Sequence, residues 1–90
     1  MVTESDLIFP ALRLMNQRAN GYIDTSTLIH ELERIFRPTG IDAEKLNNRN
    51  DTHFSQKVRN LKSHRTFERY GYAESVPGGF RITHQGRDAI

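Results

Sequence analysis

The chain has no cysteine and no tryptophan, and only three of its 90 residues are proline. Without cysteine, disulfides and thiolate metal sites are excluded. No apolar run approaches the roughly 18 residues that a membrane-spanning helix needs, and the opening MVTESDLIF carries acids where a secretory signal carries lysine or arginine. We therefore expect one soluble domain, residues 1–90, in the cytoplasm and without membrane contact.

The charge that is present is unevenly distributed. Hydrophobic residues make up 36% and charged residues 27% of the chain, which is typical of a globular domain. Residues 1–50 hold six Lys and Arg against seven Asp and Glu, whereas residues 51–90 hold seven against four. No carboxylate occurs between Asp51 and Glu68. This local positive excess favours attraction to phosphate, although the net charge is only +2.

Residues 52–64 predict a helix with two contrasting faces, which Asp51 would cap. Phe54, Val58 and Leu61 fall within roughly 60° of one another at helical spacing, so they form an apolar stripe that needs a core. The opposite face carries hydrogen-bonding side chains and no acid: Thr52, Gln56, Arg59, Asn60 and Ser63. A helix anchored on one side and polar on the other is typical of those that enter the DNA major groove.

Two amphipathic helices are predicted before this segment. The first covers about residues 3–20, where Thr3-Glu-Ser-Asp6 matches a capping pattern and Asn20-Gly21 provides an end. Pro10 lies inside it and predicts either a kink or a start just before the proline. Tyr22-Ile23 is expected to be a short extended link to the second helix. This helix covers about residues 24–36, with several capping oxygens at its start and a proline and a glycine soon after its end.

The segments on either side of the polar helix are expected to be irregular. Residues 38–50 are polar and predict a long loop, with room for a single turn around Ala43–Leu46. After the helix we expect a break near His64. On one continuous helix Phe67 would lie about 220° from Phe54, on the polar face.

The remaining residues predict a turn, a hairpin and a last helix. Thr66 opens a separate turn in which Phe67 and Tyr70 face inward. Short extended runs flank the segment 75–79, whose Pro-Gly-Gly is typical of a β-hairpin turn, and Thr83 can cap a short final helix. The predicted fold class is therefore α+β and mainly helical: a winged helix-turn-helix with a three-helix core, a C-terminal hairpin wing and a short final helix.

Three segments of the chain resemble a known group of modules. The runs FSQKVRNLKSH, GYA and FRITHQGR are similar to the small winged-helix modules of bacterial restriction systems, which occur beside Mrr-like and HNH-type nuclease domains. The resemblance implies double-stranded DNA as ligand, with residues 52–64 in the major groove and the wing 75–81 on the backbone or in the minor groove. It also implies that a separate nuclease domain or subunit performs the chemistry. The loop of about a dozen residues before the third helix departs from the usual short turn.

Side-chain chemistry assigns expected roles on this surface. Gln and Asn can pair with adenine and Arg with guanine, which favours base contacts by Thr52, Ser55, Gln56, Arg59, Asn60 and Ser63. Flanking cations and the wing favour phosphate contacts by Arg49, Lys57, Lys62, His64, Arg65, Gly78 and Arg81.

Catalysis is not expected from this chain. The nearest carboxylate group, Asp42-Ala-Glu44-Lys45, lacks the Glu-x-Lys spacing of a nuclease, and His53 and His64 would lie about 16 Å apart along a helix. We therefore expect no catalytic residue, metal or cofactor. The principal alternative is a protein–protein interaction module, an adaptor or dimerisation winged helix. The oligomeric state stays open.

Overall fold

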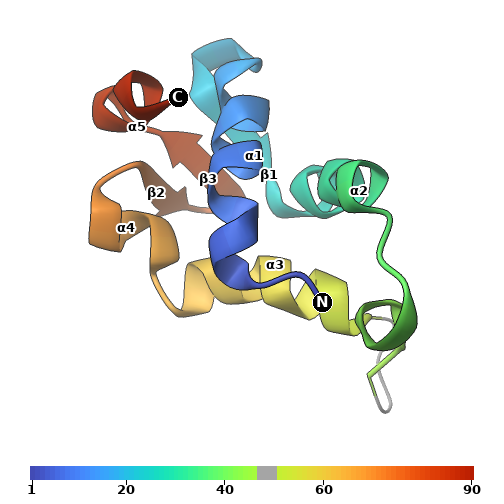
Figure 1. Ribbon diagram of the computed structural model, residues 1–90. Helices are drawn as coiled ribbons and strands as arrows, with labels where there is room; N and C mark the ends of the chain where they lie inside the picture. The colour runs from blue at the N-terminus through green and yellow to red at the C-terminus, as the bar shows by residue number, and fades with distance from the viewer. Residues whose placement is uncertain (47–50) are drawn as a thin grey trace.

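The computed structural model describes residues 1–46 and 51–90. Helices lie before, between and after the strands of a small sheet (Figure 1). In chain order the elements are α1 (Glu4–Asn16), η1 (Ala19–Gly21), β1 (Tyr22–Asp24), α2 (Thr25–Phe36), η2 (Gly40–Ala43), α3 (His53–Ser63), α4 (Thr66–Tyr70), β2 (Ala73–Val76), β3 (Gly79–Ile82) and α5 (His84–Ala89).

The first helix confirms the capping pattern and corrects the predicted end. Thr3 accepts from the backbone of Asp6 while the Asp6 side chain accepts from the backbone of Thr3, so both parts of the capping box are present. Pro10 lies within α1, which begins before it and ends at Asn16. Asn20 and the following glycine, both at positive φ, instead shape the 3-10 turn η1.

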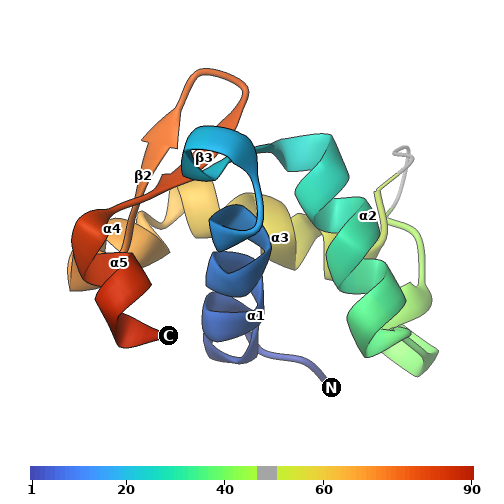
Figure 2. The ribbon, with the colours of Figure 1, turned by 90° about the horizontal axis from the view of Figure 1, so that it is seen from above.

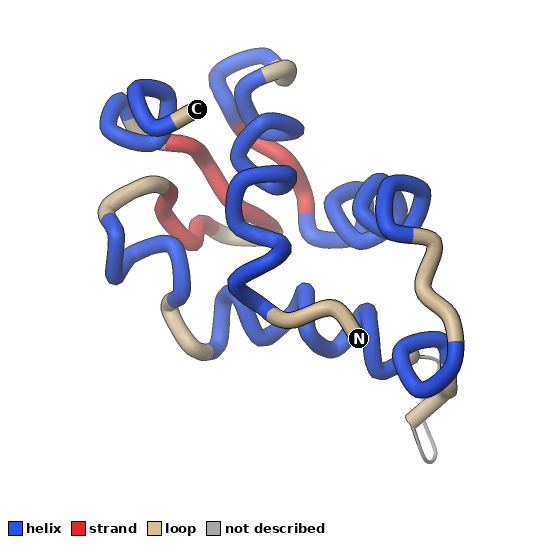
Figure 3. The backbone as a smooth tube through the Cα atoms, viewed as in Figure 1, coloured by secondary structure: helices blue, strands red, loops and turns tan. Residues whose placement is uncertain are grey.

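A three-stranded antiparallel sheet forms in the order β1-β3-β2 (Figure 3). The hairpin β2–β3 was predicted, but residues 22 and 23 were expected to be only an extended link. They pair with β3, so that Ile23 lies opposite Phe80. Gly79 permits this approach, because a Cβ there would lie 2.1 Å from the carbonyl oxygen of Ile23. Three residues are too few to show a strand periodicity in the sequence.

One hydrophobic cluster joins the helices to the sheet. Phe67 and Phe80 meet edge to face, with ring centroids 5.5 Å apart, and both are fully buried. Tyr70 was expected to face inward but is 50% exposed. Its ring stacks on that of Tyr72, with the two ring centroids 5.3 Å apart, whereas Phe67 occupies the core. The fold is therefore α+β and mainly helical, with a small antiparallel sheet.

The long loop contains a turn, as predicted, but the turn lies earlier in the chain than expected. The turn is the 3-10 segment Gly40–Ala43 and not Ala43–Leu46. Asp42 fixes it there, because its carboxylate accepts a hydrogen bond from the backbone of Val2.

Both chain ends lie on the side of the molecule away from the hairpin tip (Figure 2). In the part of the chain described, no helix has the length and apolar character that crossing a membrane requires.

Candidate nucleic-acid interface

The two-faced character predicted for α3 is confirmed on its inner side. Phe54, Val58 and Leu61 are fully buried, and α3 packs against α1, α2 and α4. The apolar stripe therefore fixes the rotation of α3 about its own axis. The opposite side of the helix is consequently directed away from the core.

The start of α3 differs from the prediction. Thr52, and not Asp51, is the N-cap: its hydroxyl accepts from the backbone N–H of Ser55 at 3.0 Å. The Ser55 hydroxyl in turn accepts from the backbone N–H of Thr52 at 2.8 Å, which completes a capping box.

This cap removes Ser55 from the expected base contacts. Ser55 is only 5% exposed, and its hydroxyl lies within hydrogen-bond distance of Asp51 and of the Thr52 carbonyl oxygen. Its position about 100° from Phe54 turns it toward α2, at the border of the buried stripe. Thr52 is half-buried and its hydroxyl is also used by the cap.

Four of the expected base-contacting residues share the outer face of α3. Gln56 donates from Nε2 to the Oδ1 atom of Asn60 at 2.9 Å, which aligns the two amides along the helix. Arg59 and Ser63 are exposed, while Gln56 and Asn60 keep intermediate exposure. These four side chains therefore offer amide, hydroxyl and guanidinium groups, and none of the four is an acid.

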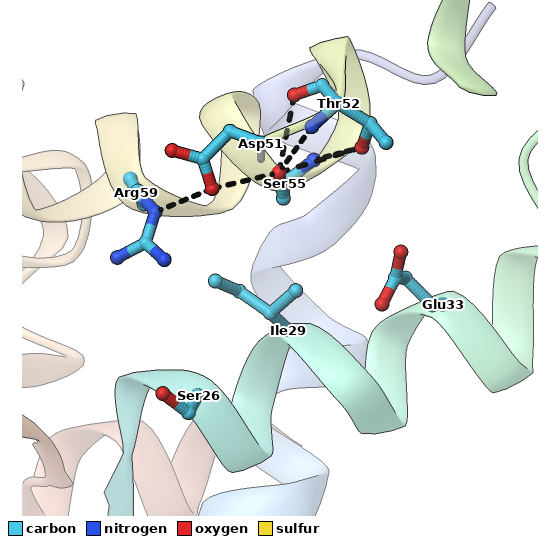
Figure 4. A pocket seen from close by; sticks show the side chains of 7 residues that line it. All are labelled: Ser26, Ile29, Glu33, Asp51, Thr52, Ser55 and Arg59. Atoms are coloured by element: carbon cyan, nitrogen blue, oxygen red, sulfur yellow. Dashed lines mark hydrogen bonds and ion pairs between the residues drawn. The ribbon is translucent and has the colours of Figure 1, made fainter. Parts of the chain in front are cut away.

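A groove of about 290 Å³ separates α2 from the N-terminal half of α3 (Figure 4). Arg59 lies at its side, where its Nε donates to Asp51 Oδ1 at 3.1 Å. Sequence reasoning missed this role of Asp51, because the two residues are eight positions apart and the contact depends on the path of the loop. The groove is lined by Ser26, Ile29, Glu33, Asp51, Thr52, Ser55 and Arg59.

Lys57 belongs to an internal ion pair, contrary to the expected phosphate contact. Its Nζ atom donates to Asp42 Oδ1 at 2.5 Å and to the carbonyl oxygen of Val2 at 2.6 Å. Asp42 is 4% exposed, and the Lys57 hydrogen bond is the main reason that the pKa of this carboxyl is lowered. The charge of Lys57 is thus neutralised within the domain.

Lys62 joins α3 to the hairpin. Its Nζ donates to the carbonyl oxygen of Val76 at 2.9 Å and lies 5.2 Å from the centre of the Phe80 ring. No carboxylate within the described residues pairs with Lys62. It combines a structural contact with a positive charge at the joint between helix and hairpin.

The end of α3 carries His64 and Arg65. His64 is the C-cap, and its Nδ1 lies 3.0 Å from Oε2 of Glu4. The other carboxylate oxygen of Glu4, Oε1, accepts a hydrogen bond from the hydroxyl of Thr66. Arg65 has a left-handed backbone and an exposed side chain. Among the described residues Arg65 has no ion-pair partner, so its charge stays available next to the outer face.

The hairpin positions the last expected phosphate contacts. Gly78 is exposed at the tip with φ +78°, and its carbonyl oxygen accepts from the backbone of Thr25, which ties the tip to the start of α2. Arg81 is exposed, with its guanidinium 5.9 Å from the Tyr22 ring centre. Arg49 lies outside the described residues.

No family model, curated protein or solved structure matches the chain. Over residues 1–46 and 51–90, no group of three or more histidines and acids is arranged to hold a metal ion. The function of the chain must therefore be inferred from the geometry of α3 and the hairpin.

Proposed function

We propose that this chain is a non-catalytic double-stranded DNA-binding module of the winged-helix type. The order helix, strand, helix, helix and hairpin, with β1 added to the hairpin sheet, supports this fold assignment. In the proposed complex α3 enters the major groove and the hairpin tip lies on the backbone or in the minor groove beside it.

One observation carries the proposal. α3 buries Phe54, Val58 and Leu61 completely while Arg59 and Ser63, on its other side, remain exposed. A helix needs this orientation to present donors and acceptors to base edges in a groove wide enough to admit it.

The charges that remain at this surface set the expected strength of binding. Lys62, Arg65 and Arg81 lack carboxylate partners within the described part of the chain, whereas Lys57 is neutralised by Asp42. If each of the three neutralises one phosphate, the slope of log K against log salt is about −3. A small module with so few contacts should bind random duplex with a Kd of about 10⁻⁴–10⁻⁶ M.

The test is a titration of ¹⁵N-labelled protein with a random duplex at two salt concentrations. We expect amide shift changes on residues 52–65 and 75–81, and a Kd that rises steeply with salt. Arg65→Ala should weaken binding and flatten the salt slope by about 1. Arg13→Ala is the matched control, because Arg13 is exposed on α1 and its replacement changes the net charge by the same amount. This variant should bind nearly as well as the wild type. Absence of binding at low salt, or equal losses in both variants, would overturn the proposal.

We also propose that the module serves a restriction, defence or regulatory system together with a nuclease domain or subunit. The resemblance of the segments 54–64 and 80–87 to modules of restriction systems supports this role. The test is whether a nuclease co-purifies with the chain from the source cells. Variants mutated on the surface outside α3 and the hairpin should lose the nuclease while they still bind DNA. DNA binding with no nuclease partner would leave a regulatory role.

A protein-interaction module is the second candidate, and an exposed aromatic group favours it. Phe9 and Tyr70 are 41% and 50% exposed and flank Tyr72, with ring centroids 6.1 Å and 5.3 Å from it. A partner protein that docks there would change the amide chemical shifts of residues in α1 and α4, and not those of the outer face of α3. Its affinity would also change little between 50 and 200 mM salt.

A further inference from the structure

We propose that Asp51 positions Arg59 to read a guanine, so that this ion pair determines sequence preference. The inference deepens the proposed DNA-binding function and depends on it. It adds Asp51, an acid, to a surface otherwise defined by cations and amides.

The contact geometry leaves the useful part of the guanidinium available. Arg59 bonds to Asp51 through Nε alone, at 3.1 Å, and its side chain is 45% exposed. A guanidinium has five N–H donors, four of them on the two terminal nitrogens. Figure 4 shows these nitrogens directed away from the Asp51 carboxylate, beside the groove between α2 and α3. No hydrogen bond joins them to another described residue.

Asp51 is itself held in place. Its Oδ1 atom accepts from the hydroxyl of Ser55 at 3.2 Å, and its side chain is 25% exposed. Ser55 is fixed in turn by the capping box with Thr52. A long arginine side chain therefore starts from a restricted position, which reduces the conformational entropy lost when it binds.

The ligand that suits this arrangement is the guanine edge in the major groove. Its O6 and N7 atoms form a neutral pair of acceptors that a guanidinium contacts with two donors. A phosphate would also accept two donors, but its charge would lie near the Asp51 carboxylate, where like charges repel. The carboxylate thus favours a base over a phosphate as the partner of Arg59.

The experiment is selection of duplexes from a randomised library by the wild-type chain and by Arg59→Ala, Asp51→Asn and the control Arg13→Ala. We expect a guanine in the wild-type site whose enrichment disappears in Arg59→Ala, with discrimination at that position falling roughly 5- to 100-fold. In Asp51→Asn the discrimination should fall about 2- to 5-fold. Affinity for random duplex should rise in the same variant, because a negative charge has been removed. Arg13→Ala should keep the guanine preference, because Arg13 is exposed on α1 and lies outside the proposed interface.

A second measurement separates a base from a phosphate. In the selected site 7-deazaguanine, which lacks the N7 acceptor, should weaken wild-type binding and leave Arg59→Ala unchanged. Equal loss on every sequence in Arg59→Ala, or no effect of the deaza base, would overturn the guanine assignment while the DNA-binding function stands. Unchanged selection by a folded Asp51→Asn variant would overturn the role of Asp51. No binding of the wild type to any duplex would remove the proposed function and this inference together.

Discussion

Lys62 of α3 donates from its Nζ atom to the carbonyl oxygen of Val76 in β2, 2.9 Å away. The two residues belong to the two surfaces that the proposed complex would place on DNA. Their contact sets the hairpin against the end of α3, so the wing and the helix are held as one unit. The Lys62 ammonium also lies 5.2 Å from the centre of the ring of Phe80, a residue of β3.

Replacing Lys62 with methionine should loosen this joint. The change keeps most of the apolar length of the side chain and removes the donor and the charge, so we expect a loss of about 1 kcal/mol in the free energy of unfolding. Amide hydrogen exchange in residues 75–80 should accelerate, and DNA binding should weaken to a similar degree on all sequences. Arg65→Met is the control, because Arg65 makes no side-chain hydrogen bond within the described chain. Equally fast amide exchange in the hairpin of both variants would show that the Lys62–Val76 contact does not hold the hairpin on α3.

Asp42 predicts a loss of stability in acid. Its pKa is lowered by the hydrogen bond from Lys57 and then by that from the backbone of Val2. The unfolded value is about 4, so ionised Asp42 stabilises the folded state at neutral pH. That contribution is lost as the pH falls from about 4 through the lower, folded pKa. Asp42→Asn should therefore lower stability at pH 7 and reduce its dependence on pH between about 5 and 2.

Urea unfolding across this pH range measures the effect of Asp42. Asp88→Asn supplies the control, since Asp88 is exposed and its only ion-pair contact within the described residues is His84, 3.4 Å away. If the stability of Asp42→Asn followed the wild-type pH curve, the ion pair with Lys57 would contribute nothing to folding.

The two serines of α3 should separate folding from binding. Ser55→Ala removes half of the capping box and should cost about 1 kcal/mol of stability. Ser55 is buried and cannot contact DNA itself, so Ser55→Ala should reduce the guanine preference only through its lost hydrogen bond to Asp51, and by less than Asp51→Asn does. Ser63→Ala should leave the melting temperature nearly unchanged and weaken DNA binding, because Ser63 is exposed on the outer face. The reverse pattern would assign the binding surface to the other side of α3.

Gly79→Ala should be among the most damaging small changes in the sheet. The new Cβ would lie 2.1 Å from the carbonyl oxygen of Ile23, a backbone atom that can move only by separating β1 from β3. We expect a loss of about 3 kcal/mol in thermal or urea unfolding. At Gly40 a Cβ would meet no atom within 4 Å, although φ is +57°. Gly40→Ala should therefore cost only about 1 kcal/mol, from backbone strain alone. Similar losses at both positions would argue against close β1–β3 packing.

Local patterns in the sequence were sufficient for several features of the fold. The inward stripe of α3 follows from the spacing of Phe54, Val58 and Leu61, because helical periodicity alone brings them to one face. The cap at Thr3 and the hairpin around Pro77-Gly78 were also predictable, since they depend on residues two to four positions apart. The orientation of α3 toward solvent, on which the proposed interface depends, could therefore be predicted from the sequence.

The tertiary structure decided which polar side chains remain available on that interface. Lys57 and Lys62 look alike in the sequence, yet one is neutralised by Asp42, fifteen positions earlier, and the other reaches Val76, fourteen positions later. The pairing of Ile23 with Phe80 joins segments still farther apart. Such contacts depend on where loops and packed helices bring distant residues together, and no local periodicity encodes that arrangement.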